Sequence, residues 1–129
     1  MSLERLIYRS TAVSEDCATE FDRIVAVSER NNERCGITGA VTLCDGRFVQ
    51  VLEGSSERLD PLLATIAQDP RHTDVHILGR WAVTGRLFPS WSMARADAAR
   101  ADAQLRSWLR SDDYGVTLVG ALLTLTGLF

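Results

Sequence analysis

The sequence predicts one α+β domain of the ferredoxin-like type, a mixed sheet built in the order βαββαββ. Short apolar runs of strand length alternate with two amphipathic segments of helical length, and an Asp-Gly pair separates two of the apolar runs. The 129 residues provide room for a single core. We expect two helices on one face of the sheet and C-terminal helices on the other. Residues 1–95 would form the sheet domain, and 96–129 a helical extension for packing or oligomerisation.

The first half of the chain predicts a strand, a helix and a hairpin. The run "RLIYRST" (5–11) has the length and composition of a strand, and "EDCATEFDRIVAVSERNN" (15–32) has the apolar spacing of an amphipathic helix. The stretch "CGITGAVTLCDGRFVQVLEG" (35–54) divides at Asp45-Gly46. An Asp-Gly pair favours the tight turn of a hairpin, so two strands are expected there.

A second helix is predicted over "SSERLDPLLATIAQD" (55–69), with Ser55 or Ser56 as its N-cap and with Glu57 and Glu53 near its positive end. Pro61 leaves another start open, in which the first turn begins one residue before it and Pro61 occupies the first helical position.

The last third of the chain predicts two strands and then two helices. "TDVHILGRWAVT" (73–84) supplies a fourth strand, and the short "SWSMA" (90–94) a fifth. Residues 97–110 and 114–128 have helical patterns, and they are the expected cover for the second face of the sheet.

Composition excludes several classes of protein. The net charge is −3 with both signs interspersed, which predicts neither a nucleic-acid partner nor a membrane-binding surface. All 14 basic residues are arginine, so Schiff-base lysine chemistry and a P-loop lysine are excluded. Three cysteines without CxxC spacing predict reduced thiols in a cytoplasmic protein. The uncharged run 115–129 falls short of the ~20 apolar residues that a spanning helix needs.

One polar residue interrupts an apolar strand. In "GRFVQVLEG" (46–54), alternation puts Gln50 on the same face as Phe48 and Leu52. A buried amide without partners costs about 1–3 kcal/mol, so something must answer its hydrogen bonds. A neighbouring backbone group or a water is one interpretation, and the polar edge of a ligand is the other.

Five motifs occur in a fixed order along the chain: "LIYRS", "NNERCGITGA", "FVQVLEG", "DPRH" and "FPSWSM". Together, over residues 3–93, they resemble the BLUF family of blue-light flavin photoreceptor domains. The resemblance implies a photoreceptor that signals through light-driven rearrangement of a hydrogen-bond network between a tyrosine, a glutamine and the flavin.

The resemblance assigns photochemical roles to five residues. Gln50 would lie between the N5/O4 edge of the flavin and the phenol of Tyr8, which would give an electron and then a proton to the excited flavin. Ser10 would tune this network from the same strand face. Trp91 and Met93 would couple the flavin site to the rest of the protein. The sequence leaves open which of these two faces the flavin, and whether Trp91 competes with Tyr8 as electron donor.

The resemblance also implies a set of cofactor-binding residues, which comprises Tyr8, Ile24, Asn31, Asn32, Gln50, Ile66, Asp69, Arg71 and His72. Asn32 would bind the O4 and N3 edge, and Ile24 and Ile66 would enclose the ring from the two helices. From the residues alone, the asparagines could equally cap the first helix, the isoleucines could be ordinary core, and "DPRH" could be a helix end with solvated charges.

FAD is the expected cofactor, with FMN or riboflavin as alternatives because no Gly-rich loop marks an adenine site. No spacing places Cys17, Cys35 or Cys44 beside the ring. No metal site is expected, because Pro70 and the strand after it break the helical spacing between His72 and His76.

Two other functions compete with a photoreceptor. An acylphosphatase-like hydrolase would need a glycine-rich anion loop after the first strand, whereas "YRSTAVSED" (8–16) contains no glycine. An interaction domain that has lost flavin is the second. We expect no attached catalytic output domain, since about 35 residues follow Met93. Apolar stripes on the C-terminal helices predict a homo-oligomer or an unknown downstream signalling partner.

Overall fold

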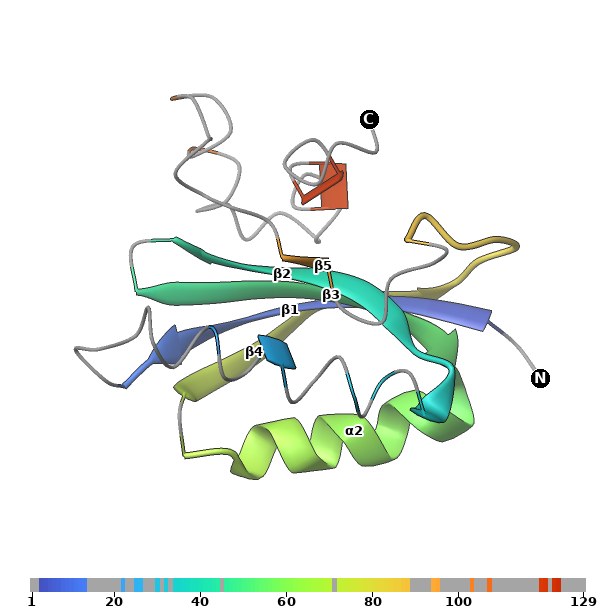
Figure 1. Cartoon of the computed structure of the whole chain (residues 1–129), viewed down its shortest axis with the longest axis horizontal. Coiled ribbons are helices and arrows are strands. Elements are labelled where there is room, and N and C mark those ends of the chain that lie inside the picture. The colour runs from blue at the N-terminus through green and yellow to red at the C-terminus, as the bar shows by residue number, and fades with distance from the viewer. Residues whose placement is uncertain are drawn as a thin grey trace.

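The computed structural model describes residues 3–13, 22, 25–26, 30, 32, 34–44, 46–70, 72–88, 94–95, 103, 107, 119–120 and 122–123. Its elements, in chain order, are β1 (Leu3–Ala12), β2 (Thr38–Cys44), β3 (Arg47–Ser55), α2 (Ser56–Gln68), β4 (His72–Ala82) and β5 (Ala94–Arg95). Figure 1 shows α2 on one side of the sheet and the described residues of 119–123 on the other.

The sheet has the strand order β4-β1-β3-β2-β5. The first four strands are antiparallel to their neighbours, whereas β5 is a two-residue strand parallel to β2. The α+β class with a mixed sheet is therefore confirmed. The order places β1 and β3 in the middle, where both are bordered by other strands.

The predicted hairpin is confirmed, because β2 ends at Cys44, β3 begins at Arg47, and the two strands pair directly with each other. Gly46 has φ 75°, a left-handed conformation that glycine adopts without steric cost. The hairpin register places Val41 opposite Gln50.

The second helix starts where its serines predicted. Ser55 is the N-cap and α2 begins at Ser56, so the alternative start just before Pro61 is wrong. Pro61 lies inside the helix, where it lacks the N–H that would bond the preceding turn. Glu57 lies in the first turn, as expected, and Glu53 precedes the N-cap by two residues. Glu53 belongs to β3, where it is fully buried and paired with Arg5.

The other predicted helices are described only in part. Every described residue from 22 to 35 has helical backbone, as do those at 103, 107, 119–120 and 122–123. The remainder of these predicted helices lies outside the described residues. In the described part of the chain, no helix is long and apolar enough to cross a bilayer.

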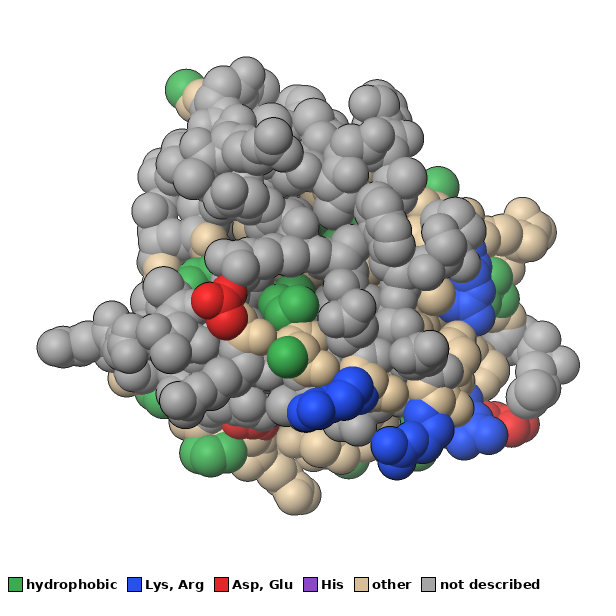
Figure 2. Space-filling model, in the orientation of Figure 1, with side chains coloured by type: hydrophobic (Ala, Val, Ile, Leu, Met, Phe, Trp, Pro, Cys, Tyr) green, Lys and Arg blue, Asp and Glu red, His purple; other side chains and the backbone are tan. Residues whose placement is uncertain are grey.

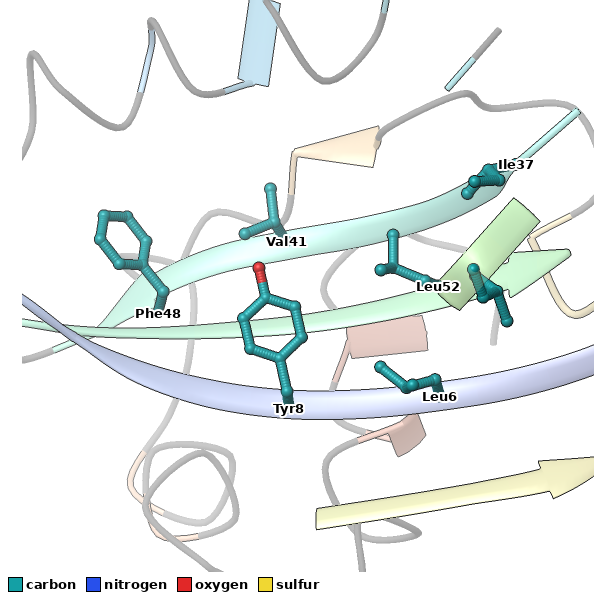
Figure 3. Packing of buried hydrophobic residues seen from close by; sticks show 7 residues of the cluster. Leu6, Tyr8, Ile37, Val41, Phe48 and Leu52 are labelled. Carbon is teal, nitrogen blue, oxygen red and sulfur yellow. The ribbon is translucent and has the colours of Figure 1, made fainter. Parts of the chain in front are cut away.

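The central strands are buried on both faces. On the side of α2, the sheet contributes to a helix-side core made of Leu6, Tyr8, Ile37, Val41, Phe48, Leu52 and Leu59, most of which Figure 3 labels. The alternate residues Ile7, Val49 and Val51 are also fully buried. Val119, Leu122 and Leu123 are buried as well, on the side that Figure 1 shows opposite to α2. This agrees with the prediction that C-terminal segments cover the second face.

Gly39 tests the hairpin packing. A Cβ at this position would lie 2.0 Å from the carbonyl oxygen of Val51, so Gly39→Ala must displace β2 from β3. We expect a loss of about 1–3 kcal/mol in the free energy of unfolding, measured by urea denaturation. Gly85→Ala is the matched control, since a Cβ there meets nothing within 4 Å. Equal stability of the two variants would contradict the packing described here.

Candidate functional site

The buried amide of Gln50 is hydrogen-bonded to the side chain of Tyr8. The two residues are direct partners across β1 and β3, and their side chains lie on the helix-side face of the sheet. The Tyr8 hydroxyl donates a hydrogen bond to Oε1 of Gln50. The side chains are only 3% and 4% exposed. This partner is a side chain from the neighbouring strand, which neither interpretation drawn from sequence had named, and a bond to a ligand edge stays a prediction.

The environment of Tyr8 keeps its phenol protonated. Burial raises the pKa of Tyr8 well above the ordinary value of 10, and the negative charge of Asp69 raises the pKa further. Figure 3 shows the ring standing on β1 with its hydroxyl directed toward Val41, among apolar side chains. A neutral phenol is a hydrogen-bond donor, as the bond to Gln50 requires.

Ser10 follows Tyr8 by two residues and pairs with Phe48 across β3. Alternation along β1 gives it the same face as Tyr8, and it is completely buried. Its expected influence on the hydrogen-bond network stays a prediction.

Asn32 lies near the end of the first helical segment but does not terminate it. The backbone remains helical at Cys35, and Gly36 takes the left-handed conformation with φ 67°. The Asn32 carbonyl accepts the N–H of Ile37 at 2.9 Å, which closes the turn. The capping interpretation is therefore wrong for Asn32. Its side chain is 99% buried, as a ligand-binding amide would be.

A cavity of about 270 Å³ lies between this helical segment and α2. Its described lining consists of Asn32, Cys35, Ile37, Glu57, Arg58, Pro61, Leu62 and Thr65. The walls combine apolar side chains with one amide, one hydroxyl and the charged groups of Glu57 and Arg58, so an apolar ring with polar edges could be held there. Arg58 is exposed, and Figure 2 shows arginine side chains gathered at the lower right, toward the start of α2.

The cavity borders the helix-side core that contains Tyr8, and its lining residues Cys35 and Leu62 pack against that core. Ile37 belongs both to the cavity wall and to the helix-side core that contains Tyr8. Tyr8 and Gln50 are not among the described lining residues, so their contact with a flavin stays a prediction.

The remaining predicted site residues divide into two groups. Ile66 packs against the helix-side core, and Asp69 caps α2, with its N–H bonded to the Ile66 carbonyl at 3.1 Å. The backbone of His72 begins β4. The predictions for Ile24, Asn31, Arg71, Trp91 and Met93 fall outside the described residues, as does the side chain of His72.

Sequence reasoning missed Cys35 as a lining residue. Residues three apart on a helix share a face, so the position of Asn32 was a usable signal for Cys35. It also missed Glu57 and Arg58 at the cavity. Within the described part of the chain, no group of three or more His, Cys, Asp or Glu residues is placed to hold a metal ion.

A family model described as "BLUF: Sensors of blue-light using FAD" matches residues 3–94. The Euglena gracilis protein "Photoactivated adenylate cyclase subunit alpha-like protein FB" is 37% identical over 93 residues, 70% of this chain and 9% of that protein. The "Blue light- and temperature-regulated antirepressor BluF" of Escherichia coli K12 is 32% identical over 73 residues, 57% of this chain and 18% of the antirepressor. This chain spans only 9% and 11% of the lengths of two such cyclase relatives.

Solved structures show the same fold. The BLUF protein BlrB, in its dark state, superposes with a TM-score of 0.83 and 28% identity, covering 95% of this chain and 96% of BlrB. Photo-activated BlsA gives a TM-score of 0.80 at 23% identity, covering 96% of this chain and 94% of BlsA. A bacterial light-regulated adenylyl cyclase gives 0.77 at 34% identity, over 84% of this chain and 33% of the cyclase.

The raised pKa of Tyr8 predicts a pH dependence of stability. Above pH 10 the unfolded chain loses the phenol proton while the folded chain keeps it, so the free energy of unfolding falls as pH rises. The loss approaches about 1.4 kcal/mol per pH unit once the unfolded phenol is ionised. Urea denaturation in steps from about pH 9 to about pH 11 measures it.

Tyr8→Phe is the control for this measurement. The variant lacks the titrating phenol but keeps the ring, so its stability should fall less steeply over the same range. An identical fall in both proteins would mean that Tyr8 is not the group responsible.

Proposed function

The chain belongs to the BLUF family of blue-light sensors using FAD, and on that basis we propose that light rearranges the Tyr8–Gln50 hydrogen bond to produce a signal. The observation that carries the proposal is this bond itself, a buried contact between a phenol and an amide next to a ring-sized cavity. The signal would reach an oligomer interface or a partner protein through the C-terminal segment.

FAD supplies the blue-light absorption and the electron-accepting excited state. The cavity between the two helical segments would hold its ring, with Asn32 and Thr65 offering polar groups there. Around them we place the family's remaining contacts, which are Ile24, Asn31, Ile66, Asp69, Arg71 and His72. FMN or riboflavin would satisfy the same ring contacts.

Gln50 is suited to switching because its amide has two different ends of nearly equal size. In the structure, the Tyr8 hydroxyl donates a hydrogen bond to Oε1 of Gln50. Half a turn of the amide about its Cγ–Cδ bond would present Nε2 instead, and the Tyr8 oxygen would then accept a hydrogen bond. The raised pKa of Tyr8 holds the proton on the phenol until light acts. The exchange of donor and acceptor changes no volume in the core.

Output from Gln50 has a short route across the sheet. Gln50 pairs with Val41 on β2, and Val41 pairs with Arg95 on β5. We propose that the segment carrying Trp91 and Met93, just before β5, responds to the rearranged amide. The C-terminal residues beyond β5 would then alter a contact with a second copy or with a partner.

We favour a sensing role over a catalytic one. The support is the match to BlrB over nearly the full length of both chains, while the cyclase relatives match over a small part of theirs. Family membership also removes the reason for an acylphosphatase-like hydrolase.

Variants of the two switch residues test the photochemistry. The purified protein should be yellow, and blue light should shift its flavin absorption to the red, reversibly and without a lasting adduct. Tyr8→Phe and Gln50→Leu should each bind flavin but lose the normal shift, because each removes one end of the hydrogen bond. A normal shift in either variant would refute its role. Protein that stays colourless after flavin reconstitution would refute the proposal as a whole.

The output step predicts light-dependent assembly. Light-scattering mass, measured in darkness and under blue light, should show more than one chain per particle, and the population should change on illumination. A monomer in both states would exclude the oligomer. An unchanged oligomer, with the same hydrogen exchange in residues 96–129 in both states, would exclude the coupling.

A further inference from the structure

The loop that follows β4, residues 83–88, is fixed to the sheet at several points. Val83 donates its N–H to the Leu3 carbonyl at 3.0 Å. The N–H groups of Leu87 and Phe88 bond to the Glu53 carboxylate at 3.0 and 2.8 Å, and the Phe88 side chain is fully buried. Six residues after Phe88 the chain enters β5 at Ala94, so this loop sets the starting point of the segment proposed to carry the signal.

Glu53 is a strong anchor because its charge is completely buried. Arg5, its direct partner across β1, places Nε and Nη2 each 2.9 Å from Oε2. Breaking a buried pair of this kind is strongly destabilising, because it leaves an uncompensated charge inside the protein. The N–H groups of Leu87 and Phe88 also donate hydrogen bonds to this carboxylate. Because a buried charge must stay hydrogen-bonded, Glu53 holds them in place. Glu53 lies three residues from Gln50 on β3, on the opposite face.

Arg86, in the same loop, reaches toward the cavity instead. Its Nη1 donates to Thr38 Oγ1 at 2.7 Å and to the Glu53 carbonyl at 2.9 Å. Its Nη2 donates to the Gly36 carbonyl at 2.8 Å. Gly36 stands between Cys35 and Ile37, both of which line the cavity. A planar guanidinium holds its donors in a fixed fork, so the three acceptors are kept in one arrangement.

We propose that Arg86 is a positioning residue of the light response, joining the cavity wall at 35–37 to the loop that leads into β5. The inference rests on the proposed function and adds a second route to the one across the sheet. Displacement of the cavity wall shifts the Gly36 carbonyl, and the rigid fork transfers that shift to the loop. Glu53 holds Leu87 and Phe88 to β3, so the shift at Arg86 turns the loop about this anchor and changes the direction in which the chain leaves toward β5.

Arg86→Met tests this, with Arg80→Met as the matched control. Arg80 also bridges two elements, through ion pairs of 2.7 Å to Glu4 and Asp60, and neither of these partners belongs to the loop. Deuterium uptake of peptides covering 89–95 and 119–123 is compared in darkness and under blue light. We expect Arg86→Met to keep the red shift of the flavin and to lose at least half of the light-minus-dark difference in uptake. Arg80→Met should retain the difference.

The readout separates positioning from simple loosening. A merely structural role would raise uptake equally in light and darkness and leave the difference intact, which would overturn the proposal. So would equal behaviour of the two methionine variants.

Thr38→Val keeps the test decisive if Arg86→Met does not fold. It removes one acceptor of the fork with little change of shape, so a smaller loss of the light-minus-dark difference is expected, and no loss overturns the proposal. The double variant should lose no more than Arg86→Met alone, because both act through one contact. A wild-type protein without any red shift would instead refute the proposed function.

Discussion

Two polar side chains, Gln50 and Glu53, are buried on opposite faces of β3, and each must find its hydrogen-bond partners inside the protein. Both partners come from β1: Tyr8 stands opposite Gln50 and Arg5 opposite Glu53. A slip of one residue between the strands would exchange the two faces. It would leave the Gln50 amide and the Glu53 carboxylate without these hydrogen-bond partners. The register of the central strand pair therefore depends on both contacts at once, and the sheet is built outward from it.

The two contacts differ in strength, and that difference suits them to different tasks. A neutral hydrogen bond contributes a net stability of about 0.5–1.5 kcal/mol, so exchanging one arrangement of an amide for another is energetically close to even. Removing one partner of a buried ion pair costs about 3–5 kcal/mol. The Tyr8–Gln50 bond can rearrange while the Arg5–Glu53 pair holds the register, so a switch is possible without loss of the fold.

Sequence patterns predicted what depends on local chemistry and missed what depends on distant partners. Alternation and the Asp-Gly pair gave the hairpin, and the same alternation singled out Gln50 as an amide among apolar neighbours. Glu53 was expected near the positive end of the second helix, a local explanation that did not require a distant partner. Its ion-pair partner, Arg5, is 48 residues away in sequence, and the alternation of apolar residues in the strands does not predict this pair. The roles given to Tyr8 and Asn32 came from family resemblance, since a lone tyrosine or asparagine has many ordinary places in a core.

The pairing of β5, the shortest strand, is the part of the sheet that a small change in free energy alters most. β5 pairs with β2 over only two residues, at Ala40 and Val41, and Val41 is also the neighbour of Gln50. A difference of about 1.4 kcal/mol changes an equilibrium tenfold, which is the scale of one hydrogen bond. Such a change is minor for β1 and β3, which are paired along their whole length, but it is comparable to what a two-residue strand has to lose. Within the proposed function, β5 is therefore the element that a rearranged amide can displace, and Arg86 and Glu53 determine from which point on the chain is able to move.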